Sequence, residues 1–130
     1  MASEDITRAN IVAKAEDWMG TPYLWGGNSK NGIDCSHFVY QVYRAAGLDY
    51  GYATTSAIAG SSKFKSTTTP RKGDLVLWSG HMGIVLDPIE GSFMGAQSEG
   101  VGKSNYKTNS YWKNRAGLSF YAWVGIETSP

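Results

Sequence analysis

Apolar residues recur at helical spacing in two stretches near the start of the chain. The first stretch follows Ser3 and is closed by Gly20 and Pro22; its stripe is Ile6, Ile11, Val12, Ala15 and Trp18. The second stretch is followed by Gly47, a typical C-terminal stop, and its stripe is Cys35, Phe38, Val39, Val42 and Ala46. The pattern therefore predicts two amphipathic helices, the second over about residues 35–46.

After the helices the chain changes to short apolar runs that are typical of strands. Residues 49–69 are rich in Tyr, Ser, Thr, Ala and Gly, which predicts a long excursion with a short helix near Ser56–Ser61. A turn over residues 70–74 leads to the predicted strands Leu75–Trp78, His81–Leu86, Ser92–Gln97 and Ser119–Glu127. Helices first and strands afterwards predict an α+β fold, with N-terminal helices packed on an antiparallel sheet.

Composition narrows the class of protein without assigning a function. The length of 130 residues predicts a single domain over residues 1–130. A net charge of +1 argues against a nucleic-acid partner or a polybasic membrane anchor. No apolar run is long enough to span a bilayer, so we expect no membrane insertion, and the N-terminus lacks the apolar core of a signal peptide.

The candidate chemistry centres on Cys35, the only cysteine, which begins the second predicted helix. The positive end of a helix favours a thiolate, and with an imidazolium nearby the thiol pKa is expected to fall to roughly 3.5–7.5. His37 lies about 200° around the same helix at ~100° per residue and is badly placed to reach the thiol. His81 opens a strand, with Gly83 beside it on the same face to leave room for another group. We therefore expect His81 to accept the Cys35 proton and later return it to the leaving amine.

A catalytic imidazole usually needs a third polar group to fix its orientation. The next predicted strand offers Gln97, whose side-chain carbonyl could accept the histidine N–H, and Glu99 is the alternative. We favour Gln97. Two histidines and one cysteine at wide spacing lack the clustered ligands of a zinc site, so no metal and no cofactor are expected.

Four segments, in this order, resemble the NlpC-type family of bacterial cell-wall peptidases. Residues 20–27 read Gly-Thr-Pro-Tyr-Leu-Trp-Gly-Gly, and residues 34–36 read Asp-Cys-Ser. Residues 72–78 read Lys-Gly-Asp-Leu-Val-Leu-Trp, and residues 80–85 read Gly-His-Met-Gly-Ile-Val. The resemblance covers roughly residues 10–100, and four segments in the right order make it far more specific than any one of them.

The resemblance implies a papain-like cysteine hydrolase that cleaves the peptide stems of peptidoglycan. The bond is usually the one between γ-D-glutamate and a diamino acid. By this likeness Cys35 is the nucleophile, His81 is the base and Tyr23 lines the pocket of the nucleophile. Asp34 and Ser36 occupy positions that, in some members, bind the free amine of the stem peptide. The backbone N–H of Cys35 would contribute to the oxyanion hole.

Two positions depart from the family pattern. The residue after Asp-Cys-Ser is commonly Gly, and here it is His37. The third catalytic residue is often His, and the corresponding position here is Gly95, which has no side chain to serve. Gln97 lies one strand period later on the same face and could substitute for it.

Other functions stay open at this point. The same Cys–His pair could serve an acyltransferase or an amidase acting on a non-murein amide, and a degenerate hydrolase could act as a cell-wall binding module. The resemblance places the protein in the periplasm or the extracellular cell wall. Two settings fit equally: an effector opposed by an immunity or inhibitor protein, and a catalytic piece of a larger cell-wall or phage-tail protein.

Overall fold

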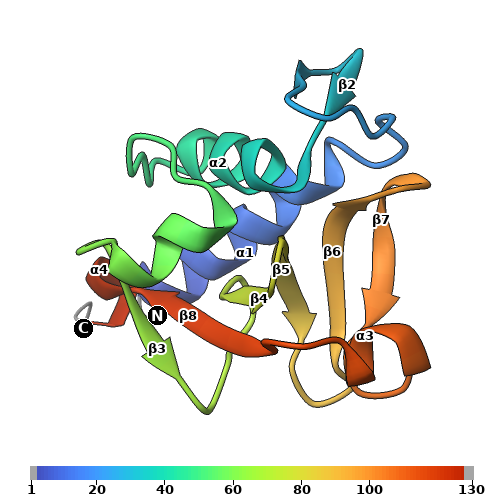
Figure 1. Cartoon of the computed structure of the whole chain (residues 1–130). Helices are drawn as coiled ribbons and strands as arrows, with labels where there is room; N and C mark the ends of the chain where they lie inside the picture. Colours follow the sequence, from blue (N-terminus) through green and yellow to red (C-terminus); the bar gives the residue numbers. More distant parts are fainter. Residues whose placement is uncertain (1–2, 128–130) are drawn as a thin grey trace.

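A computed structural model describes residues 3–127 of the chain. The helices α1 (Ser3–Glu16) and α2 (Cys35–Ala45) come first, and both lie beside one face of the main sheet (Figure 1). This is the α+β class predicted from the sequence. The main sheet is antiparallel, with the strand order β3-β8-β4-β5-β6-β7; its members are β3 (Phe64–Thr67), β4 (Leu75–Trp78), β5 (His81–Asp87), β6 (Ser92–Gln97), β7 (Gly100–Asn105) and β8 (Ser119–Trp123).

Smaller elements connect these parts. A two-stranded sheet of β1 (Asn28–Ser29) and β2 (Gly32–Ile33) lies just before α2. A 3-10 helix, η1 (Thr55–Gly60), lies within the excursion that follows α2, where a short helix was predicted. Two short helices, α3 (Ser110–Asn114) and α4 (Val124–Glu127), flank β8 along the chain.

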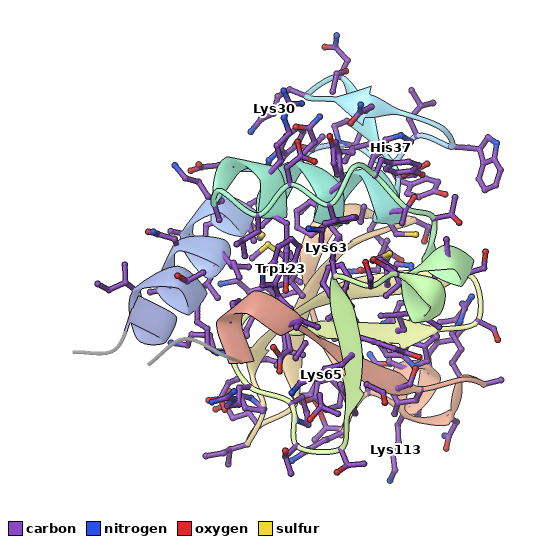
Figure 2. The ribbon with its side chains drawn as sticks, turned by 90° about the vertical axis from the view of Figure 1, so that its left-hand side faces the viewer. Lys30, His37, Lys63, Lys65, Lys113 and Trp123 are labelled. Carbon is purple, nitrogen blue, oxygen red and sulfur yellow. The ribbon has the colours of Figure 1, made fainter. Side chains whose placement is uncertain are left out.

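Alternation along the strands produces one apolar layer on each face of the sheet. The layer toward α1 and α2 is the larger, and its fully buried members include Ile11, Phe38, Val39, Val42, Met82, Ile84 and Met94. Trp123 packs at its edge, between the helices and the sheet (Figure 2). The opposite face carries a second layer of Val76, Trp78, Val85, Phe93 and Tyr106, against which Trp112 and Phe120 pack. The apolar stripe predicted for the second helix therefore faces the larger layer.

The start and end of α2 follow from single residues. Asp34 is extended and caps the helix, with its Oδ1 accepting from the backbone N–H of His37 at 2.9 Å. At the other end Gly47 has φ +88°, a left-handed conformation that glycine adopts without strain. Cys35 is thereby fixed as the first residue of the helix, as the sequence predicted.

A buried ion pair joins α1 to the turn before β4. Arg8 Nη1 donates to Asp74 Oδ1 at 2.7 Å, and both side chains are almost fully buried. The second carboxylate oxygen of Asp74 accepts the backbone N–H of Arg71 at 2.8 Å. The hydroxyl of Tyr43 on α2 donates to the carbonyl of Gly73 in the same turn. Both N-terminal helices are therefore tied to the turn that leads into the strands of the site.

The last predicted strand, Ser119–Glu127, is wrong in its second half. The strand β8 ends at Trp123, and residues 124–127 form α4. The Val124 N–H donates to the carbonyl of Lys63 at 2.8 Å, which turns the chain away from the sheet and lets Ile126 reach the core. Residues 64–67, predicted as part of the excursion, form β3 and pair with β8. No helix in the described part of the chain is long and apolar enough to cross a bilayer.

Candidate active site

The first turn of α2 packs against β5 and brings Cys35 to the sheet. The Cys35 side chain is half-buried, and its sulfur lies 3.8 Å from the Thr55 hydroxyl of η1. Backbone hydrogen bonds from Ser36 and Met82 also reach the sulfur. Since Met82 directly follows His81 on β5, the thiol lies against the strand that carries the predicted base.

The pKa of the Cys35 thiol is raised, not lowered as the sequence predicted. Burial is the largest cause, because it penalises the charged thiolate. The Thr55 hydroxyl and the Met82 amide act in the opposite direction but do not outweigh it. Packing of α2 on the sheet removes water from the thiol, and this cost exceeds the benefit of its place at a helix start. Cys35 is therefore a thiol near neutral pH.

The side chain of His81 bonds to Gln97 on the neighbouring strand. Its Nε2 lies 3.2 Å from Gln97 Oε1, and Gln97 Nε2 donates to the carbonyl of Gly102 at 3.2 Å. The Gly102 carbonyl can only accept, which fixes the orientation of the Gln97 amide. Since Oε1 also can only accept, the proton of the neutral imidazole is on Nε2, and Nδ1 is left as the basic nitrogen. Glu99, the alternative partner, is exposed.

Gly95 is the reason that Gln97 can reach the imidazole. A Cβ at position 95 would come within 2.3 Å of Gln97 Oε1 and 3.3 Å of His81 Nε2. The space where the family often carries a side chain is thus filled by the Gln97 amide. The room beside Gly83, by contrast, is occupied by the Phe93 ring and the Met94 carbonyl of β6 rather than by a catalytic group.

Trp112 of α3 covers the imidazole, a contact that sequence reasoning missed. The two rings are stacked, with centroids 4.7 Å apart and an interplanar angle of 27°. Trp78 lies on the same side of the sheet, and its indole N–H donates to the Trp112 carbonyl at 2.9 Å. Burial lowers the pKa of His81 to about 4, so the imidazole is neutral over the neutral pH range. Residues 111–112 form an isolated aromatic pair without helical or strand periodicity, so no signal in the sequence indicates that Trp112 stacks on His81.

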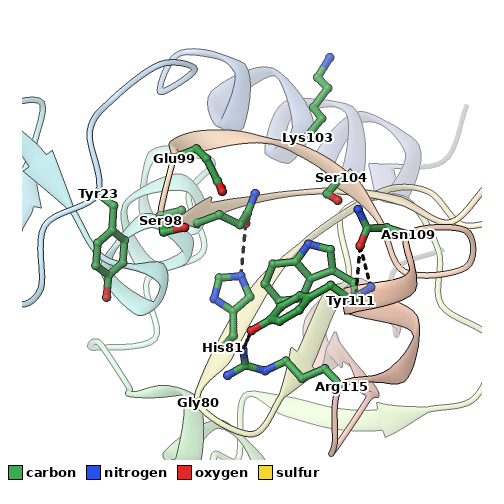
Figure 3. A pocket seen from close by; sticks show the side chains of 13 residues that line it. Tyr23, Gly80, His81, Ser98, Glu99, Lys103, Ser104, Asn109, Tyr111 and Arg115 are labelled. Atoms are coloured by element: carbon green, nitrogen blue, oxygen red, sulfur yellow. Dashed lines mark hydrogen bonds between the residues drawn. The ribbon is translucent and has the colours of Figure 1, made fainter.

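A cavity of about 670 Å³ adjoins the imidazole. Tyr23 lies at one end, His81 in the middle, and Tyr111 and Arg115 on the other side (Figure 3). Cys35 is not among the thirteen described residues that line this cavity. Tyr23 lines this cavity, and the pKa of its hydroxyl is raised by burial and then by the charges of Cys35 and Asp34.

The remaining predicted site residues, Asp34 and Ser36, form a small polar network. Asp34 Oδ1 accepts from the Ser36 hydroxyl at 3.3 Å and lies 2.8 Å from His37 Nδ1, while Oδ2 accepts the Gly26 N–H at 3.1 Å. The Ser36 hydroxyl also lies 2.7 Å from the hydroxyl of Tyr52, whose ring stacks on His37. The imidazole of His37 thus bonds to the helix cap. Both predicted amine ligands already have partners within the protein.

No metal centre is apparent in the part of the chain that the structure describes. Among those residues, no group of three or more His, Cys, Asp or Glu side chains lies close enough together to hold an ion.

The chain is similar in sequence to known proteins. Residues 20–119 match the model of the NlpC/P60 family. The chain is 36% identical over 113 residues to the probable peptidoglycan endopeptidase LytE of Bacillus subtilis, a match covering 82% of this chain and 32% of LytE. It is 32% identical over 114 residues to the Escherichia coli murein DD-endopeptidase MepS/murein LD-carboxypeptidase, covering 83% of this chain and 59% of that protein.

Solved structures show the same fold. The crystal structure of the NlpC/p60 domain of the peptidoglycan hydrolase SagA superposes with a TM-score of 0.68 at 31% identity, covering 88% of this chain and 97% of that domain. The chain spans about a third of the length of LytE.

Proposed function

This chain belongs to the NlpC/P60 family, and from that premise we propose that it is a cysteine hydrolase of peptidoglycan stem peptides. The proposed bond joins γ-D-glutamate to the diamino acid that follows it. Relatives named as peptidoglycan endopeptidases support the substrate class. The site of action would then be the cell wall, in the periplasm or outside the cell.

In the proposed mechanism Cys35 Sγ attacks the carbonyl carbon of the scissile amide while its proton passes to Nδ1 of His81. The tetrahedral oxyanion receives a hydrogen bond from the backbone N–H of Cys35, which lies at the start of α2. The C–N bond then breaks as His81 returns the proton to the leaving amine. Water, deprotonated by His81, attacks the thioester, and the acid product and the free thiol are released.

The single observation that carries this proposal is the hydrogen bond between His81 Nε2 and Gln97 Oε1. It holds the proton on Nε2 and directs the basic Nδ1 away from Gln97. A neutral imidazole and a neutral thiol form a competent pair, because the proton can move during the attack rather than before it. Tyr23 would line the path to the nucleophile, and Asp34 and Ser36 would meet the free amine of the stem while Asp34 keeps its capping bond.

The test is digestion of a defined muropeptide, followed by mass spectrometry of the products. The wild-type protein should give one fragment that ends in D-glutamate and a second that begins with the diamino acid. Cys35→Ser and His81→Ala should each lower turnover by at least 100-fold, because each removes a partner of the proton transfer.

The same substitutions need a check that they leave the fold intact. Far-ultraviolet circular dichroism and urea unfolding should show both variants folded. Normal release of stem fragments by Cys35→Ser would remove the thiol from the reaction. Fragments cut at another bond would still support hydrolase activity, but they would refute the assignment of the γ-D-glutamyl bond.

A further inference from the structure

The cavity beside His81 extends well beyond the groups used in the proposed reaction. Figure 3 shows Tyr23 on one side of the imidazole and the α3 segment, with Tyr111 and Arg115, on the other. This second half has a rigid wall. Asn109 caps α3 by accepting the N–H groups of Tyr111 and Trp112, and the indole N–H of Trp78 holds the Trp112 carbonyl.

Arg115 places a positive charge in that wall. Its Nη1 donates to the Tyr111 hydroxyl at 2.6 Å and its Nη2 to the Ser79 carbonyl at 2.7 Å. Both partners are neutral. Among the residues that the structure describes, no carboxylate forms an ion pair with this guanidinium. The fork is therefore held in place while its charge remains available to a ligand.

The other lining cation is less available. Lys103 Nζ lies 3.1 Å from the Glu16 carboxylate on α1. Arg115, in contrast, lines the same cavity as His81, and its charge is, after burial, a second cause of the lowered pKa of His81. A substrate group that meets Arg115 must consequently lie close to the imidazole.

The proton transfer from His81 determines which part of the substrate meets Arg115. His81 must deliver a proton to the leaving amine, so the residue after the scissile bond lies beside the imidazole. Arg115 lies on the side of His81 away from Tyr23, and the hydroxyl of Tyr23 responds to charge on Cys35. The acyl half of the substrate belongs with Cys35, and the leaving half belongs with α3.

We propose that Arg115 binds a carboxylate carried by the side chain of the leaving residue. On the proposed function, on which this inference rests, that residue is the diamino acid of the stem. The chain would then select stem peptides whose diamino acid has a free side-chain carboxyl, as meso-diaminopimelate does, over peptides in which this carboxyl is amidated.

The test compares two tetrapeptides, L-Ala-γ-D-Glu-meso-diaminopimelate-D-Ala and the same peptide with the side-chain carboxyl of the diamino acid amidated. The wild-type protein should cleave the acid with a kcat/KM at least about tenfold above that of the amide, as a charge-assisted hydrogen bond predicts. Arg115→Gln should lower kcat/KM for the acid about tenfold relative to the amide, mostly through KM, so that the variant cleaves the two peptides about equally well.

Two variants serve as controls. Lys113→Gln removes a positive charge from α3, the helix that Arg115 follows, at a side chain that does not line the cavity, and it should keep the wild-type preference. Arg115→Lys keeps the charge without the planar fork and should keep part of the preference, which separates loss of recognition from loss of folding.

Binding to the Cys35→Ala variant, measured by calorimetry, separates this inference from the proposed function. Tighter binding of the acid than of the amide, lost in the Cys35→Ala, Arg115→Gln double variant, supports the subsite even if the wild-type protein cleaves neither peptide. Equal binding of the two peptides, or a preference that survives Arg115→Gln, refutes it.

Discussion

The orientation of the His81 imidazole depends on two residues of the neighbouring strand, Gly95 and Gln97. The imidazole can be held by Gln97 only because position 95 has no side chain, and Gln97 is in turn oriented by the Gly102 carbonyl. Gly95, which stands where the family often has its third catalytic residue, therefore helps to orient His81 by leaving room for Gln97.

Adding one methyl group should test this device. Gly95→Ala places a Cβ 2.3 Å from Gln97 Oε1, the far end of a flexible side chain that can swing aside. We expect kcat on a defined muropeptide to fall about tenfold, the worth of one hydrogen bond of ~1.4 kcal/mol. The free energy of unfolding in urea should change by less than about 1 kcal/mol.

The matched control is Gly102→Ala on β7, where an added Cβ meets nothing within 4 Å. It should leave kcat unchanged. A Gly95→Ala variant with full activity would show that Gln97 does not position the base.

At the scale of elements, α3 controls the protonation of His81 although it contributes no catalytic group. Its Trp112 ring covers the imidazole, and burial is the largest cause of the pKa of about 4. In Trp112→Ala, water regains access, and the pKa of His81 should rise toward 6.5. The measurement is a titration of the imidazole C–H resonances by NMR.

Trp25→Ala is the comparison for that titration, because Trp25 is 86% exposed and should leave the pKa of His81 at about 4. If Trp112→Ala also left it there, strand packing rather than α3 would be the source of the burial.

The ion pair that attaches α1 to the turn before β4 should stabilise the fold. Asp74→Ala removes the carboxylate that pairs with the buried Arg8 Nη1, and removing one partner of a buried pair costs about 3–5 kcal/mol. Urea unfolding should show a loss of this size. Glu16→Ala breaks only the exposed pair with Lys103 and should cost less than about 1 kcal/mol. Equal losses in the two variants would contradict this account.

The sequence predicted those elements whose signals are local. The second helix was found almost to the residue, because an apolar stripe, a capping Asp34 and the stop at Gly47 coincide. The strand β7 was missed: residues 100–105 contain a single apolar side chain, Val101, and pairing with β6 alone makes them a strand. The raised pKa of Cys35 was missed for a related reason, since its burial depends on contacts made across the fold.

The candidate site also contains some contacts that local sequence patterns predict and others that only the fold creates. The alternation of strands placed His81, Gly95 and Gln97 on one face, and the structure has the hydrogen bond that this register allows. Trp112, which covers the imidazole, lies in a five-residue helix that no periodic pattern marks, and Arg115 directly follows that helix.

At the scale of the whole molecule, the buried neutral imidazole makes stability depend on pH. The pKa of His81 is about 4 in the folded protein and 6.5 ordinarily, so between these values the unfolded chain binds a proton that the folded protein does not. Acidification from pH 6.5 to 4 should therefore lower the free energy of unfolding by up to roughly 3 kcal/mol through this group, and the contribution is fully present above pH 6.5.

Urea unfolding at several pH values, compared with His81→Gln, isolates that contribution from the carboxylates that titrate in the same range. The wild-type protein should lose more stability than the variant as the pH falls. Identical pH profiles of the two proteins would contradict a neutral buried imidazole.

The central position of β8 means that the main sheet cannot be completed until late in translation. Residues 119–123 pair with β3 on one side and β4 on the other, so the last strand to leave the ribosome fills a gap between two that emerged much earlier. Until then both neighbours present unpaired backbone groups to solvent. A nascent chain halted before residue 119 should be a substrate for chaperones, and the complete sheet can form only once translation has passed that point.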